Sequence, residues 1–247
     1  MSTRPLPTRK EEAWRYSDVE AAARLWPVAI RRHAVGPGEA LVQEIVLDAD
    51  NDAIEDHEVA IGAGGRAEFR VLVAGSGFGR VFVKARLAEN AHFELAGAIV
   101  GGGRQVGEIV TRIGHDAPGG TSRQLVRAVL AGRATGNYLG KVAVARDAQR
   151  SDGSQSVKAM LVEPGATANL KPELEIYADD VKCAHGASIG ALDSDALFYL
   201  ASRGVGEAEA KALLLRGFVA EAFAGIEDEA ARERLSALAD AAVARIV

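Results

Sequence analysis

Short runs of alternating apolar and polar residues dominate the chain from about residue 35 to residue 181. Val71 to Val73, Val81 to Val83 and Val142 to Val144 are examples, and glycine, aspartate and asparagine separate one run from the next. Alternation predicts β-strands, because successive side chains of a strand point to opposite faces. Many short strands joined by turns are typical of a sandwich, a barrel or a solenoid.

An internal repeat favours the solenoid among these folds. When Asp116 is placed on Asp147, the segment 116–130 aligns with the segment 147–161, and six of the fifteen positions are identical. The identical residues of the first copy are Asp116, Ala117, Gln124, Val126, Ala128 and Leu130. A coil that cannot bury its apolar face alone stacks on the next coil, so the repeat predicts a β-solenoid. An eight-stranded sandwich is the alternative.

Two short helices are predicted near the N-terminus. Thr8 and Glu11 have the spacing of a capping box, and Ser17 and Glu20 repeat that spacing. The predicted helices cover residues 9–16 and 18–25.

The apolar spacing becomes helical from about residue 193. Asp193 or Ser194 can cap a helix over residues 195–202, and Gly204 can end it in the left-handed conformation. Two more helices are predicted over residues 207–223 and 228–247. The chain is thus expected to consist of an N-terminal helical segment (1–30), a β-core (31–192) and a C-terminal helical region (193–247).

The helix over residues 207–223 carries an apolar stripe. Its members are Leu215, Phe218, Val219, Ala222 and Phe223. Such stripes usually pack on neighbouring elements. A face that binds a partner protein is the alternative.

Composition narrows the functional classes. A net charge of -5 argues against nucleic acid and membrane surfaces as partners. The single cysteine excludes an internal disulfide and a zinc site built from several cysteines of this chain. The charged, proline-broken N-terminus does not resemble a secretory signal, and no apolar run is long enough to span a bilayer. We therefore expect a cytoplasmic protein.

Common catalytic motifs give no support for an enzyme. Residues 186–190 fit G-x-S-x-G, but no histidine follows them to act as the base, so we interpret them as a glycine-rich loop. Neither a phosphate-binding P-loop nor a dinucleotide-binding motif is present. His33, His57, His92 and His115 occur singly, as ordinary surface or turn residues do.

Cys183 and His185 are the strongest candidates for chemistry. Residues i and i+2 of a strand share a face, so a thiolate and an imidazole would lie together, and both can bind metal. Asp179 and Asp180 could add oxygen ligands or simply mark a turn. Alternatively, Cys183 has no chemical role and packs in the core as a small apolar side chain does.

Three segments resemble the SufB/SufD family of the SUF iron–sulfur cluster assembly system. The longest runs from Lys171 to Gly204 and reads KPELEIYADDVKCAHGASIGALDSDALFYLASRG. The others are PTRKEEAWRYSDV (Pro7 to Val19) and GNYLGKVAVA (Gly136 to Ala145). The resemblance implies a right-handed parallel β-helix flanked by helical regions. The N-terminal motif and the single cysteine favour the SufD type, with the SufB type as the alternative.

The resemblance also implies function. It predicts a non-catalytic scaffold subunit that pairs with a SufB-type subunit and docks a SufC-type ABC ATPase, for which the stripe Leu215 to Phe223 is the candidate surface. It places Cys183 and His185 near the SufB interface, as ligands of transient iron or of a nascent cluster. A cluster takes about four thiolate or imidazole ligands, so the partner must supply the rest.

No cofactor is expected to bind tightly to the isolated chain, which could also form a homodimer. A β-helical enzyme acting on a carbohydrate or acyl group is the alternative from a different class, and a groove of clustered acids on the solenoid would support it.

Overall fold

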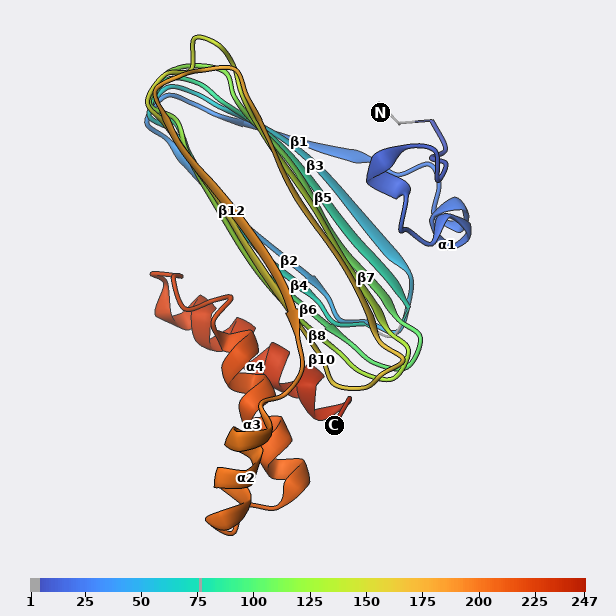
Figure 1. The fold of residues 1–247 in the computed structure, drawn as a ribbon. Helices are drawn as coiled ribbons and strands as arrows, with labels where there is room; N and C mark the ends of the chain where they lie inside the picture. Colours follow the sequence, from blue (N-terminus) through green and yellow to red (C-terminus); the bar gives the residue numbers. More distant parts are fainter. Residues whose placement is uncertain (1–4, 76) are drawn as a thin grey trace.

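Two six-stranded parallel sheets form the body of the molecule in the computed structural model, which describes residues 5–75 and 77–247. The chain alternates between the sheets, so each coil adds one strand to each sheet, as Figure 1 shows along the solenoid axis. Sheet A has the order β1-β3-β5-β7-β9-β11, and sheet B has the order β12-β10-β8-β6-β4-β2. This is the predicted parallel β-solenoid; the sandwich alternative is wrong.

The strands share similar lengths from β3 onward. Their bounds are β1 Ile30–Val35, β2 Ala40–Leu47, β3 Ala53–Ile61, β4 Arg66–Val73, β5 Phe78–Leu87, β6 His92–Gly101, β7 Val106–His115, β8 Thr121–Leu130, β9 Thr135–Val144, β10 Ser151–Leu161, β11 Thr167–Ile176 and β12 Val181–Gly190. The helices are η1 Glu12–Trp14, α1 Val19–Arg24, α2 Ser194–Ser202, α3 Glu207–Ala220 and α4 Glu229–Ala244.

Strand register explains the repeat. Val157 of β10 pairs with Val126 of β8, the residue that the repeat aligns with it, so the predicted shift is one full coil. Earlier coils are shorter, since the step from Ile45 to its partner Val71 is smaller than the step from Val126 to Val157. Coil length changes along the stack, so the shift found in the sequence aligns β8 with β10 and not the earlier, shorter coils.

The space between the sheets is filled by apolar side chains. Phe69, Phe93, Leu95 and Ile109 are fully buried there, one layer above another along the stack. Stacked turns also approach closely: Gly132 has φ +63°, and a Cβ on it would lie 3.0 Å from the backbone nitrogen of Gly103. Only glycine fits such a position.

The N-terminal segment crosses the outer face of sheet A. Residues 9–16 form only the 3-10 turn η1 and not the predicted helix. Helix α1 is capped by Asp18, whose side chain accepts hydrogen bonds from the amides of Glu20 and Ala21, and not by Ser17. Ser17 is buried and donates instead to Glu108 of β7, at 3.0 Å. The local spacing was therefore overridden by a tertiary contact.

A buried ion pair holds this N-terminal segment in place. Arg80 of β5 pairs with Glu108, and both side chains are almost completely buried. Arg80 also donates to the carbonyl of Ala13, and its guanidinium lies 3.7 Å from the centre of the Trp14 ring. Asn137 of β9 donates to the same carboxylate at 2.8 Å. The segment thus completes a polar network that would otherwise be exposed on the sheet.

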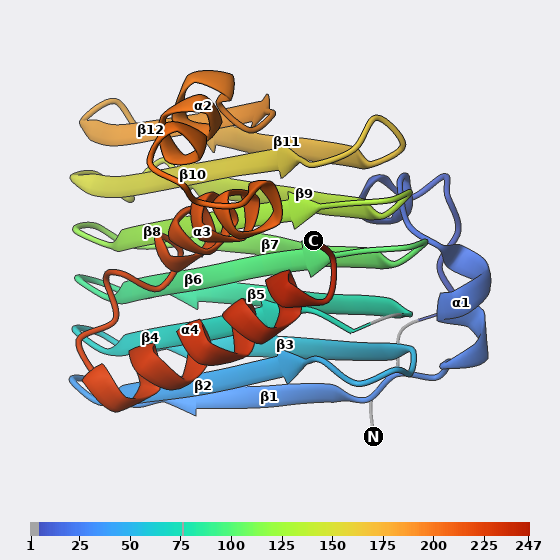
Figure 2. The ribbon, with the colours of Figure 1, turned by 90° about the horizontal axis from the view of Figure 1, so that it is seen from below.

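The C-terminal helices cover sheet B. Figure 2 shows α4 crossing the early strands, α3 over the middle of the sheet and α2 beside β12. Asp193 caps α2 as predicted, and Gly204 follows it with φ +86°. No helix of residues 5–75 and 77–247 is both long and apolar enough to cross a membrane.

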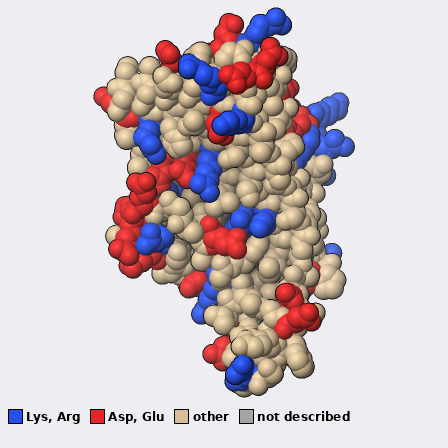
Figure 3. Space-filling view, turned by 60° about the vertical axis from the view of Figure 1, so that its left-hand side comes forward, with Lys and Arg blue, Asp and Glu red and all other residues tan. Residues whose placement is uncertain are grey.

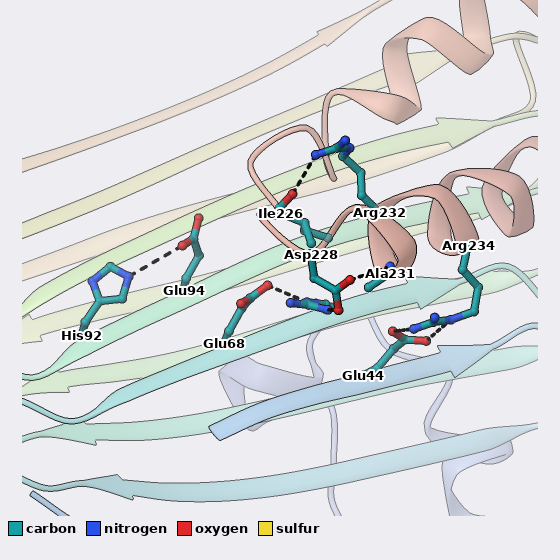
Figure 4. Close-up of polar contacts among 10 residues, drawn as sticks. Glu44, Glu68, His92, Glu94, Ile226, Asp228, Ala231, Arg232 and Arg234 are labelled. Atoms are coloured by element: carbon teal, nitrogen blue, oxygen red, sulfur yellow. Dashed lines mark hydrogen bonds and ion pairs between the residues drawn. The ribbon is translucent and has the colours of Figure 1, made fainter. Parts of the chain in front are cut away.

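Ion pairs fix the helices to the sheet (Figure 4). Asp228 caps α4 by accepting from the amide of Ala231, and it also pairs with Arg70 of β4 at 3.4 Å. Arg234 of α4 pairs with Glu44 of β2. The orientation of α4 across the strands is thus set by charge as well as by apolar packing.

Candidate functional site at the open end of the solenoid

Cys183 and His185 lie on β12, the last strand of sheet B. This strand pairs only with β10, so its other edge is unpaired among the strands that the structure describes. Cys183 stands over Gly153 and His185 over Gln155, and both β10 residues are buried. The two candidates therefore continue an inward-facing column of the solenoid, at the end where no further coil of the described chain covers it.

Cys183 is the more enclosed of the two. Its side chain packs on the solenoid core, and a Cβ built on Gly153 would lie 3.5 Å from its Sγ. Burial raises the pKa of the thiol, and the backbone of Gly153 only partly offsets this. The protonated form, a poor metal ligand, is thereby favoured, so Cys183 also serves as the small packing residue that was the alternative.

His185 is exposed, and it makes no hydrogen bond or ion pair with the residues that the structure describes. The side chain beneath it is fixed: Tyr138 donates to Gln155 Oε1 at 2.9 Å, and Gln155 Nε2 donates to the carbonyl of Glu173 at 3.1 Å. The His185 imidazole is therefore exposed, and it lies above a side chain that two hydrogen bonds hold in place.

The two aspartates do not complete a metal site. Asp179 and Asp180 lie in the turn before β12, where the Asp180 backbone bonds to Gln149 and Arg150. Among the described residues, no group of three or more His, Cys, Asp or Glu side chains could hold a metal ion. The open end therefore offers a partial donor set.

Apolar side chains surround these donors. On β12, Ile189 is 51% exposed, and Ile176 at the end of β11 is 40% exposed. Both continue columns that are buried in the coil below, since Ile189 pairs with Ala159 and Ile176 with Val144. The open end is thus a layer of the apolar core that no further coil of the described chain covers.

The first coil ends differently, and two histidines predicted to be isolated meet there. His33 of β1 and His57 of β3 are hydrogen-bonded at 3.0 Å with parallel rings. Glu55 accepts from His57 at 3.3 Å and pairs with Arg31 at 2.7 Å. The two histidines become neighbours because the coils stack. The spacing of residues within one strand does not reveal such a contact. The edge formed by β1 is thus polar, whereas β2 carries the exposed apolar side chain of Val42.

The other two histidines are also structural. His115 is buried and hydrogen-bonded to Ser122 at 2.8 Å, and His92 is bonded to Thr121 at 2.6 Å. The predicted glycine-rich loop at residues 186–190 is instead part of β12. A strand does not present a serine nucleophile as the strand-to-helix turn does.

The stripe predicted as an ATPase dock faces inward. Leu215, Val219, Ala222 and Phe223 are at most 1% exposed and pack on the outer face of sheet B. Phe218 is half-buried, and its ring centre lies 5.9 Å from the Arg127 guanidinium. In this structure the stripe is therefore a packing face, and its buried members are not accessible to a partner.

Other apolar side chains of the helical region are exposed. Phe198 and Tyr199 of α2 are 76% and 57% exposed, and Leu213 of α3 is 54% exposed. Helix α2 has no buried residue, and the projection that contains it is largely uncharged (Figure 3). Sequence reasoning missed this face, although the run ALFYLA is apolar on all sides of a helix and cannot bury every side chain.

A groove of about 460 Å³ lies on the outer face of sheet A, beside the N-terminal segment. Its three carboxylates are engaged with cations. Asp116 pairs with Arg86 at 2.7 Å, while Glu12 and Glu173 both pair with Lys171. Carboxylates neutralised in this way are not the acid–base pair of a glycosidase, so the groove does not support the enzyme alternative.

Comparison with protein families gives a match over most of the chain. The family described as "SUF system FeS cluster assembly, SufBD core domain" matches residues 42–218. This range begins in β2 and ends in α3, so it includes the solenoid end with Cys183 and His185.

Similar curated proteins belong to the same system. The iron–sulfur cluster assembly protein SufD of Escherichia coli is 36% identical over 116 residues, which are 47% of this chain and 27% of that protein. The chloroplastic protein ABCI7 of Arabidopsis thaliana is 41% identical over 117 residues, 46% of this chain and 24% of that protein. The chain thus matches only about a quarter of the length of these relatives. The match over residues 42–218 nevertheless shows that this chain belongs to the SufB/SufD family of the SUF iron–sulfur cluster assembly system.

Proposed function

We propose that this chain is a SufD-type, non-catalytic scaffold subunit that pairs through the open end of its solenoid with a SufB-type subunit. The observation that carries the proposal is the apolar, unpaired final coil. An exposed sheet edge is a template for another strand, and isolated proteins usually cover or charge such edges. Here the edge strand β12 and the apolar side chains around Ile189 are left open.

The two ends of the stack support this choice of surface. At the other end, Arg31 and His33 of the first coil are engaged with Glu55 and His57 of the second, although Val42 of β2 is also exposed there. The last coil presents Ile176 and Ile189, whose burial by a partner would be favourable, at about 25 cal/mol per Å² of apolar surface. Pairing at the last coil would also bring partner ligands to His185.

We propose that His185 is the iron ligand from this side of the interface and Cys183 a weaker second donor. A protein that holds only part of a donor set needs the partner for a complete site. Such a partial site would not hold a cofactor tightly in the isolated chain.

The His185→Ala variant tests this assignment. Assembly with the partner should be unchanged, because the side chain makes no hydrogen bond or ion pair with the described residues of its own chain. Iron content, or the yield of cluster in the reconstituted complex, should fall clearly. Iron analysis and the visible absorption of the cluster are the measurements. The Ser188→Ala variant, on the same strand with the opposite orientation, is the matched control, and equal yields from both variants would remove His185 from the site.

We further propose that the SufC-type ATPase docks on the exposed apolar side chains of α2 and α3, which are Phe198, Tyr199 and Leu213. Three large apolar side chains exposed on one small helical region are characteristic of an interaction surface. This assignment replaces the buried stripe around Leu215.

The Leu213→Asp variant should release the ATPase. Leu213 is 54% exposed, so an aspartate there leaves the fold intact, but a charge placed in an apolar interface loses its hydration. We expect affinity for the ATPase to fall at least about tenfold, measured by pull-down and titration. Ala237→Asp is the control, because Ala237 is exposed on α4, a helix that we do not assign to the dock. Normal retention by Leu213→Asp would exclude this face.

A further inference from the structure

Three positively charged side chains form a continuous row across the outer face of sheet A. Lys84 of β5 is directly opposite Arg112 of β7, and Arg112 is directly opposite Lys141 of β9. Adjacent strands are about 4.8 Å apart, so the three charges are close neighbours. Like charges directly opposite each other destabilise a sheet. Strand pairing therefore does not explain why these three cations lie next to one another.

A carboxylate flanks this row at each end: Glu58 of β3 is directly opposite Lys84, and Glu173 of β11 is directly opposite Lys141. Lys141 pairs with Glu175 at 2.5 Å. Lys84 and Arg112 have no ion-pair partner among the residues that the structure describes, although Asp116 and Glu173 line the same groove and are paired elsewhere. Glu58 is itself paired with Arg32, so Lys84 and Arg112 are two adjacent cations without an ion pair of their own in a chain of net charge -5.

The row lines the 460 Å³ groove beside the N-terminal segment. Phe82, Val110 and Leu139 form an apolar cluster one row nearer that segment, and Ala13 packs against it. The volume is within the range of small-molecule sites, which combine an apolar lining with a few polar groups. The size of the groove, its apolar lining and its two cations without an ion pair fit a small anionic ligand.

We propose that this groove binds a small polyanion, a compound with a diphosphate or with two or more carboxylates, between Lys84 and Arg112. Arginine offers paired donors to such oxygens, and lysine adds a second positive charge. A bound anion would offset the repulsion along the row. The proposal does not depend on the proposed scaffold function, because residues of β5, β7, β9 and β11 of sheet A line the groove. Figure 1 shows α1 on the side of this sheet and the C-terminal helices on the side of the other sheet.

Titration of the full chain with inorganic pyrophosphate and with citrate, at low ionic strength, tests the proposal. We expect at least one of the two anions to bind. The one that binds more tightly shows whether the groove prefers phosphate or carboxylate groups. Arg112→Gln should weaken binding at least about tenfold, as loss of a charge-assisted contact does. In the absence of ligand it should raise the Tm by about 1–3 °C, because it removes a like-charge contact.

Lys158→Gln is the matched control, since Lys158 is an exposed cation of sheet B outside this groove. It should bind the anion as the wild type does. Lack of binding of both anions at millimolar concentration would overturn the proposal. Equal weakening by Lys158→Gln and Arg112→Gln would also overturn it, because it would show a general charge effect.

Discussion

The Ile189→Asp variant is expected to abolish stable pairing with the SufB-type subunit while the chain itself remains folded. Ile189 is 51% exposed on the unpaired strand β12, so its replacement costs the isolated chain little. In the proposed complex the aspartate would be buried in an apolar layer without a counterion. Such a burial costs about 3 kcal/mol or more, which corresponds to at least about a 100-fold loss of affinity.

Co-purification and size-exclusion chromatography of the two subunits measure this effect. The matched control is Ser188→Asp, which adds the same charge to the same strand but on its outward face. We expect the Ser188→Asp complex to form, and circular dichroism should show both variants folded. If Ile189→Asp pairs as tightly as the wild type, the open end is not the interface.

The Glu108→Gln variant is expected to lower the free energy of unfolding by about 3–5 kcal/mol, because it leaves the Arg80 guanidinium buried without its counterion. Glu108 accepts hydrogen bonds from Ser17 and Asn137 as well as pairing with Arg80. The variant should also loosen the N-terminal segment, since Ser17 and Arg80 are two of its attachments to the sheet.

Urea unfolding gives the loss of stability, and tryptophan emission reports the segment. Both tryptophans of the chain, Trp14 and Trp26, lie there with ring centres 5.9 Å apart. We expect red-shifted emission in Glu108→Gln below the main transition. Glu175→Gln breaks an exposed pair with Lys141 on the same face of the sheet and should cost less than about 1 kcal/mol. Equal costs for the two variants would mean that the buried pair contributes little.

Local and periodic features of the sequence were sufficient for most of the fold. Alternation predicted the strands, the alignment of Val126 with Val157 predicted the stacking of β8 on β10, and Asp193 marked the start of α2. These features depend on neighbours in the chain or on a fixed period. The same logic failed at Ser17, where contact with Glu108, far along the chain, replaced the expected cap.

The candidate site, too, could be predicted from the sequence only in part. The spacing of Cys183 and His185 sufficed to place them on one face, because a strand has a fixed period of two. It could not show that this face is the uncovered end of the solenoid, since that depends on which strand lacks a neighbour.

The sequence by itself determined the alternating strands, the coil repeat, the amphipathic helices and the shared face of the two donors, all of which follow from backbone geometry. Only the tertiary structure decided that the stripe around Leu215 is buried, that Phe198 is exposed, that His33 meets His57, and that Lys84 stands beside Arg112. These contacts join residues from different coils or from different elements. Their proximity depends on turn lengths and on the docking of helices, which no local pattern of residues records.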